Sequence, residues 1–202
     1  SEILVSSLEH HSNIVPWQMV CNQTGAKLVV APINDAGEIL LEEYLKLLSK
    51  KTKIVAIGHI SNALGTINQV KTMTEQAHAV GAKILLDGAQ AIIHDRVDVE
   101  NLNCDFYAFS GHKALGPTGI GVLYGKKELL ENMPPWQGGG DMIKTVSFEK
   151  TQYNDLPYKF EAGTPNIVGG IGLGAALEFF KSLDLKKVIA HENNLLERAT
   201  RR

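Results

Sequence analysis

Short apolar runs alternate with stretches of helical spacing along much of the chain. Each run is nearly continuous, which is typical of a strand covered on both faces of a sheet. Between the runs, apolar residues recur at helical spacing, and glycine turns mark where the helices end. The predicted strands are 3–7, 28–30, 53–57, 82–86, 106–109 and 121–124. The predicted helices are one from Ile14 to near Gly25, then 39–48, 70–80, 167–183 and 185–202.

This alternation predicts an α/β fold, a three-layer sandwich with a mostly parallel sheet. Polar residues gather just after the strands, at the carboxyl ends where such sheets bind ligands. We therefore expect several residues that are distant in sequence to converge on one crevice. They are His10, Asn62, Asp87, Gln90 and the segment 110–113.

Composition narrows the function classes. The chain has 202 residues, 44% of them hydrophobic, with a net charge of −2. This allows one sizeable core and gives no basic field for nucleic acid or an anionic membrane. No apolar run reaches the roughly 20 residues of a membrane span. Cys21, Cys104 and the histidines match no metal-ligand pattern, so we predict no metal site, and sparse cysteine suits the cytoplasm.

The two ends of the chain also carry an expectation. A strand-like run begins at once after Ser1, and the amphipathic pattern of 185–202 simply stops. We therefore expect residues 1–202 to be an internal piece of a longer protein, with further functional residues elsewhere.

Lys113 follows an apolar strand and comes directly after Ser110, Gly111 and His112. Near a low-dielectric wall an ammonium is disfavoured, so a lysine there is more easily a neutral nucleophile. Such an amine forms a Schiff base with a carbonyl, including the aldehyde of pyridoxal phosphate. Ser110 and His112 can donate hydrogen bonds to phosphate oxygens. A solvated lysine at a strand end is the commoner alternative.

Asp87 ends another apolar strand, where an unpaired carboxylate is costly. A protonated pyridine nitrogen would pair with it, although a turn or cap aspartate explains the position equally well. His10 could stack on an aromatic ring or simply cap a helix, and chemistry alone does not choose between it and His11. Asn62 and Gln90 are amides that could hold a phenolic oxygen.

Two later loops are rich in turn residues. Gly163 and Thr164 could offer an N–H group and a hydroxyl to a phosphate, or serve only a turn. The loop 138–140 lacks the lysine of a phosphate-binding loop and does not follow a strand as a dinucleotide motif would. We expect it to be a mobile or closely packed loop.

Six segments, taken in order, resemble one family. They are 9–17 (EHHSNIVPW), 59–65 (HISNALG), 86–90 (LDGAQ), 109–113 (FSGHK), 134–140 (PPWQGGG) and 160–166 (FEAGTPN). Together they are similar to the SufS-type cysteine desulfurases and selenocysteine lyases of the class V aminotransferase superfamily. Each segment alone is modest, whereas six in the same order are specific.

The resemblance implies the large domain of a fold-type I pyridoxal phosphate enzyme. In that domain Lys113 is the Schiff-base lysine, Asp87 pairs the ring nitrogen and His10 stacks on the ring. It also implies cofactor contacts at the remaining candidate positions. These are Asn62 and Gln90 at the phenolic oxygen, Ser110 and His112 at the phosphate, and Gly163 and Thr164 at the phosphate of the neighbouring subunit. A weaker implication is that His10 and His112 assist proton transfer.

The implied reaction converts L-cysteine to alanine and leaves a persulfide for iron–sulfur cluster assembly, in a homodimer that hands sulfur to an acceptor protein. The family's persulfide cysteine, substrate-binding arginines and small domain match nothing in this chain, and neither Cys21 nor Cys104 fits. The fragment alone is therefore expected to be inactive. The residues leave open a selenocysteine lyase, a kynureninase-like relative, or a non-catalytic core.

Overall fold

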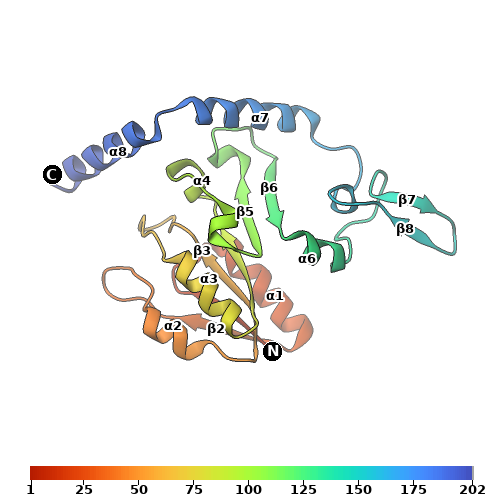
Figure 1. The fold of residues 1–202 in the computed structure, drawn as a ribbon, viewed down its shortest axis with the longest axis horizontal. Helices are drawn as coiled ribbons and strands as arrows, with labels where there is room; N and C mark the ends of the chain where they lie inside the picture. Colours follow the sequence, from red (N-terminus) through yellow and green to blue (C-terminus); the bar gives the residue numbers. More distant parts are fainter. Residues whose placement is uncertain (202) are drawn as a thin grey trace.

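The computed structural model describes residues 1–201, which are built around a six-stranded sheet (Figure 1). The strand order is β2-β1-β3-β4-β5-β6; all neighbours are parallel except β5 and β6, which are antiparallel. The strands are β1 (Glu2–Ser6), β2 (Lys27–Ala31), β3 (Thr52–Gly58), β4 (Lys83–Asp87), β5 (Phe106–Ser110) and β6 (Gly121–Gly125). All six predicted strands are present, with ends that differ from the prediction by a residue or two.

Helices cover both faces of the sheet (Figure 1). Helix α1 (Val15–Thr24) lies behind it, and α2 (Leu41–Leu47) and α3 (Val70–Ala79) lie in front. Gly25 ends α1 in the left-handed conformation (φ 72°), which glycine adopts without strain. Helix α2 is shorter than the predicted 39–48 because Leu40 and Leu48 are extended. The predicted α/β class with its mostly parallel sheet is confirmed.

The core lies between the sheet and the front helices. Val55 and Ile57 of β3 are fully buried, as is Tyr44 of α2. The Tyr44 hydroxyl donates to the carbonyl of Met73 at 2.8 Å, which satisfies its polar end and ties α2 to α3. A continuous apolar strand such as β3 is stable only in this two-sided burial.

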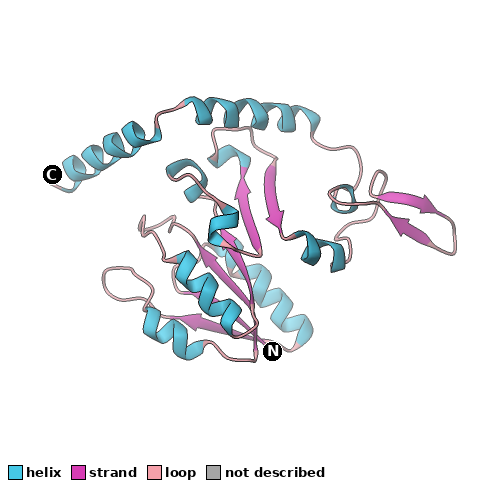
Figure 2. Ribbon diagram, viewed as in Figure 1, coloured by secondary structure: helices cyan, strands magenta, loops and turns pink. Residues whose placement is uncertain are grey.

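The part after β6 forms an arm and a hairpin (Figure 2). Helices α7 (Ile167–Ser182) and α8 (Leu185–Thr200) run along one side of the molecule, and β7 (Ile143–Val146) and β8 (Thr151–Tyr153) pair antiparallel. Of the predicted helix 185–202, Arg202 lies outside the described residues. The short elements are η1 (His11–Asn13), α4 (Ala91–His94), α5 (Val99–Leu102), η2 (Gly111–Lys113), α6 (Lys127–Asn132) and η3 (Tyr158–Phe160).

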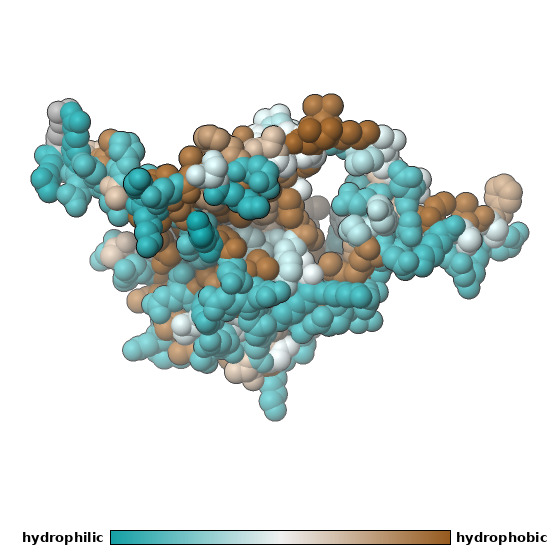
Figure 3. Space-filling view, turned by 45° about the horizontal axis from the view of Figure 1, so that its top comes forward, coloured by the Kyte–Doolittle hydropathy of each residue, from teal (hydrophilic) through white to brown (hydrophobic). Residues whose placement is uncertain are grey.

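Hydrophobic residues gather on the surface along α7 (Figure 3). Val168 is 81% exposed and Ile171 is 71% exposed, whereas Gly169 and Leu173 of the same helix are buried. Helix α7 therefore presents an uncovered apolar side. Among residues 1–201, none of the helices has the length and apolar character needed to cross a membrane.

Candidate active site

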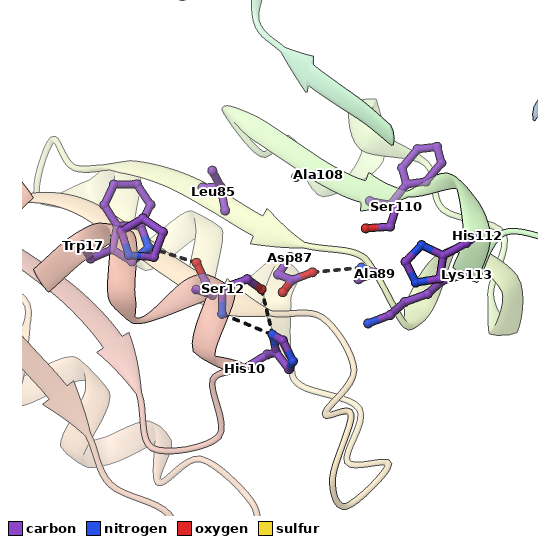
Figure 4. A pocket seen from close by; sticks show the side chains of 13 residues that line it. His10, Ser12, Trp17, Leu85, Asp87, Ala89, Ala108, Ser110, His112 and Lys113 are labelled. Atoms are coloured by element: carbon purple, nitrogen blue, oxygen red, sulfur yellow. Dashed lines mark hydrogen bonds between the residues drawn. The ribbon is translucent and has the colours of Figure 1, made fainter. Parts of the chain in front are cut away.

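The carboxyl edge of the sheet holds a cavity of about 660 Å³ (Figure 4). Lys113, Asp87 and His10 all line it, although they follow three different strands. The Lys113 side chain extends from the end of β5 towards His10 and Asp87 (Figure 4). The parallel strands β1, β4 and β5 deliver these residues to one edge, as the sequence predicts. Ser110 and His112 line the same cavity.

Lys113 is held by a tight loop after β5. The N–H of Gly111 donates to the carbonyl of Ile120 at 2.8 Å, which closes the loop at its base. A Cβ at Gly111 would lie 2.9 Å from that same oxygen, so a larger residue cannot be accommodated without backbone movement. Gly111 begins the short η2 turn, and its last residue, the half-buried Lys113, faces the cavity.

Asp87 serves a turn and the cavity at once. One carboxylate oxygen, Oδ1, accepts a hydrogen bond from the Ala89 N–H at 2.9 Å. Within residues 1–201 no donor is bonded to the other oxygen, and Asp87 lines the cavity wall. The turn interpretation and the ligand interpretation of Asp87 are therefore compatible.

His59 and Tyr107 form a buried pair next to Asp87. Tyr107 fills the space beside Gly88, where any Cβ would overlap its ring. The Tyr107 hydroxyl lies 3.0 Å from the ring nitrogen Nδ1 of His59. The backbone N–H of His59 donates to the backbone carbonyl of Asp87 at 2.8 Å. Burial lowers the pKa of His59 and raises that of Tyr107, so both stay neutral near pH 7. Sequence reasoning gave this pair no role, because nothing in the sequence relates residue 59 to residue 107.

The structure separates His10 from His11. His10 lines the cavity, and its Nδ1 accepts a hydrogen bond from the Ser12 N–H at 3.2 Å and lies 2.8 Å from Ser12 Oγ. His10 thereby caps the η1 turn and still faces the cavity. His11 does not line this cavity, so of the two histidines it is His10 that lies at the cavity wall.

The two amides lie next to the cavity. A smaller pocket of about 20 Å³ is lined by Asn62 and Gln90, and it shares His10, Asp87 and Lys113 with the main cavity. The structure thus brings seven of the nine predicted site residues together. They are His10, Asn62, Asp87, Gln90, Ser110, His112 and Lys113.

Gly163 and Thr164 do not reach this cavity. Gly163, with a φ of 81°, lines a separate hollow of about 470 Å³. Its N–H donates to the Gly140 carbonyl at 3.0 Å, which ties the second loop to the glycine-rich loop 138–140. A place away from the cavity of the same chain is compatible with a role at a neighbouring subunit.

Glu9 is the site residue that sequence reasoning missed. It is 8% exposed, and its carboxylate accepts hydrogen bonds from Ser6, Asn13 and the Gly58 N–H. Burial raises the pKa of Glu9, those hydrogen bonds oppose the rise, and the charge of Asp87 adds to it. The signal that could have found it is a charged residue shortly after an apolar strand, similar to Asp87 at the end of β4.

The two cysteines lie away from this chemistry. Both are free and buried, Cys21 in α1 and Cys104 just before β5. Burial raises the pKa of Cys104 to about 11, so the thiol stays protonated and unreactive near neutral pH. No cluster of three or more His, Cys, Asp or Glu side chains suited to a metal ion occurs in the described part of the chain.

The sequence of the chain matches a known protein family. The model of the class V aminotransferases matches residues 1–202. The chain belongs to the class V aminotransferase family. A cysteine desulfurase of Synechococcus elongatus is 56% identical over 199 residues, which is 98% of this chain and 32% of that protein. A cysteine desulfurase of Escherichia coli is 54% identical over 198 residues, covering 98% of this chain and 49% of that protein.

Solved structures agree with this membership. A cysteine desulfurase of Thermococcus onnurineus aligns with a TM-score of 0.95 and 39% identity, over 100% of this class V chain and 50% of that one. The E. coli cysteine desulfurase CsdA aligns with a TM-score of 0.89 and 49% identity, over 92% and 46%. The predicted fold-type I architecture is thereby confirmed. The chain spans about half the length of these proteins, and a third of the cyanobacterial one.

Proposed function

We propose that residues 1–202 form most of the pyridoxal-phosphate-binding large domain of a cysteine desulfurase. The observation that carries the proposal is that Lys113 and Asp87 face one cavity, with His10 at its wall. Relatives at 54 and 56% identity over 98% of the chain bear the name cysteine desulfurase. In this proposal the small domain lies outside residues 1–202.

The cavity fits the cofactor in size and in chemistry. Its volume of about 660 Å³ lies in the range of small-ligand sites, and its wall combines an amine, a carboxylate, an imidazole and a hydroxyl. Lys113 would bind the cofactor aldehyde, Asp87 would pair the ring nitrogen and His10 would stack on the ring. Asn62 and Gln90 would hold the phenolic oxygen, and Ser110 and His112 the phosphate.

When bound, pyridoxal phosphate supplies an electron sink for a carbanion at the substrate α-carbon. Asp87 would keep the ring nitrogen protonated, which keeps that sink effective. The Lys113 amine, which faces the cavity, would also accept the α-proton of L-cysteine. The imidazoles of His10 and His112 would assist proton movement at the edge of the cavity.

The sulfur-accepting group must be supplied from elsewhere. Cys21 and Cys104 are buried, and a protonated thiol such as Cys104 is a poor nucleophile. The proposal therefore requires a cysteine outside residues 1–202 that takes the sulfur as a persulfide and leaves alanine. Substrate-carboxylate arginines, an acceptor protein for iron–sulfur assembly and a cytoplasmic location belong to the same proposal.

The proposed protein is a homodimer. Gly163 and Thr164 lie away from the cavity of their own chain. Residues that complete the phosphate site of a second copy would likewise lie away from the cavity of their own chain. An uncovered apolar side on α7 is a further reason to expect that this domain is covered by additional protein.

Borohydride trapping tests the proposal on the full-length protein. Reduction should bleach the yellow colour and fix the cofactor on the peptide that contains Lys113, as mass spectrometry would show. Lys113→Ala should abolish both the adduct and alanine production, whereas Lys71→Ala, at an exposed lysine of α3, should change neither. A reduced adduct that persists in Lys113→Ala contradicts the proposal. Parallel assays with cysteine, selenocysteine and kynurenine separate the desulfurase from its relatives.

A further inference from the structure

Glu9 is a buried acid that the proposed chemistry does not use. It lies shortly after β1, beyond Ser7 and Leu8, is 8% exposed and lines the smaller pocket. A buried carboxylate is costly unless donors satisfy it. Its position next to a cofactor cavity therefore calls for an explanation.

Three donors from three elements converge on the Glu9 carboxylate. Ser6 Oγ, at the end of β1, donates to Oε1 at 2.5 Å. Asn13 Nδ2, in η1, donates to Oε2 at 2.6 Å, and the Gly58 N–H, at the end of β3, donates to the same oxygen at 2.7 Å. We call Ser6, Glu9, Asn13 and Gly58 the Glu9 cluster.

The Glu9 cluster extends to the cavity wall through Asn13. Asn13 Oδ1 accepts a hydrogen bond from Trp17 Nε1 at 2.9 Å, and the Asn13 N–H donates to the His10 carbonyl at 2.7 Å. Asn13, Trp17 and His10 all line the main cavity. A chain of short hydrogen bonds thus runs from the end of β3 to the turn that carries His10.

We propose that Glu9 is a positioning residue whose carboxylate fastens the turn carrying His10 to the ends of β1 and β3. Ser12 sets the angle of the imidazole within that turn, as its N–H donates to His10 Nδ1. Glu9 sets where the turn itself lies relative to the sheet. The inference rests on the proposed function, because its consequence is a cofactor ring held between His10 and the Asp87 side of the cavity.

Two substitutions of Glu9 separate the effect of its side-chain length from the effect of its negative charge. In Glu9→Gln the amide oxygen can still accept from Asn13 and Gly58, while the NH₂ group donates to Ser6 Oγ, so the fastening survives without the charge. In Glu9→Asp the charge survives, but a side chain shorter by one methylene cannot reach both β1 and β3. A positioning role predicts opposite results for the two variants.

The test is a titration of pyridoxal phosphate into full-length protein from which cofactor has been removed, with thermal unfolding measured in parallel. Glu9→Asp should weaken binding about tenfold or more, since it leaves buried donors unsatisfied and frees the turn, and Glu9→Gln should stay within about threefold. Asp105→Asn is the matched control, because Asp105 is 1% exposed and lies just before β5, at the amino ends of the strands and away from the cavity. It should lower the melting temperature and leave cofactor affinity within about twofold.

Wild-type affinity in Glu9→Asp would overturn the inference, as would a Glu9→Gln protein that binds as weakly as Glu9→Asp. The second result would assign the effect to charge. Loss of affinity in Asp105→Asn as large as in Glu9→Asp would also overturn it, since the effect would then follow stability alone. Failure of the proposed function looks different: the wild-type protein itself would form no borohydride-stable bond to the cofactor.

Discussion

Gly88 shows how one missing side chain fixes the position of the residue before it, Asp87. The Tyr107 ring lies where a Cβ on Gly88 would be, and the Tyr107 hydroxyl meets the buried His59. Because the ring and the turn are packed against each other, Asp87 cannot shift without disturbing the core. The side chain of Asp87 is therefore fixed by packing as well as by its bond to Ala89.

Gly88→Ala should destabilise the protein by about 1–3 kcal/mol, the usual effect of forcing a methyl group into a packed site. It should also weaken cofactor binding, because Asp87 is displaced with the turn. The measurements are chemical denaturation and cofactor titration. Gly174→Ala is the control: nothing lies within 4 Å of its Cβ position in α7, and alanine there favours the helix. Equal stability of Gly88→Ala and wild type would contradict the packing argument.

At the residue scale, the sequence predicted which residues converge where polar side chains lie at the ends of strands. The sequence predicted that Asp87, Lys113 and His10 converge on one cavity, because each lies at or shortly after the end of an apolar run. Glu9 shares that signal, but its partners Asn13 and Gly58 become neighbours only when β1 and β3 pair. His59 and Tyr107 were missed for the same reason, since their contact spans two strands.

At the scale of elements, the two ends of the strands differ in what they carry. The cavity lies at the carboxyl ends, and a buried carboxylate, Asp105, lies at the amino ends. Asp105, just before β5, accepts hydrogen bonds from the Ile84 N–H at 2.8 Å and from His78 Nε2 at 2.7 Å. It thereby ties β4 and α3 to the start of β5.

The stability that Asp105 contributes depends on pH. Burial alone would raise its pKa, but the Ile84 and His78 hydrogen bonds and the nearby Lys126 outweigh burial and hold the pKa below the usual value of an aspartate. A lowered pKa in the folded state means that the stabilisation is present above the pKa of the unfolded chain and is lost as pH falls through the lower folded value.

Asp105→Asn should therefore cost about 1–3 kcal/mol at neutral pH, with a difference from wild type that shrinks in acid. Denaturant unfolding of both proteins at a series of pH values measures that difference. Glu2→Gln, which removes a partly buried acid of β1, is a control that should show little change. A difference that grows as pH falls would contradict the assigned sign.

The major elements were predictable because their signals are periodic. The six strands and five long helices appear where apolar spacing predicts them. Helices α4, α5 and α6 span four to six residues each, too short for a helical period to emerge. The β7–β8 hairpin was missed because its strands are short and mostly exposed, so that no buried face sets their pattern.

At the scale of the whole molecule, the uncovered side of α7 is the feature with the plainest physical consequence. Ile167, Val168 and Ile171 are 59, 81 and 71% exposed. Contiguous apolar surface of this kind marks a place where other protein packs. The proposal of a longer, dimeric protein accounts for it.

Residues 1–202 produced alone should therefore self-associate, which light scattering and sedimentation would detect. Val168→Glu with Ile171→Glu should reduce the association, because charge opposes burial of that side of α7. Asn193→Glu with Asn194→Glu is the matched control, since it adds the same charge on the exposed surface of α8. A fragment that stays monomeric at high concentration would contradict this reading of α7.

The loop that carries Lys113 joins two strands that pair with each other, Ser110 facing Gly121 across β5 and β6. Its ends are closed by the Gly111–Ile120 bond, and the Gly116 N–H returns to the Gly111 carbonyl at 2.9 Å. Such a connection tolerates neither insertion nor cutting without moving the amine. A split or circularly permuted version should instead be opened at the tip of the β7–β8 hairpin, where new termini would leave Lys113 in place.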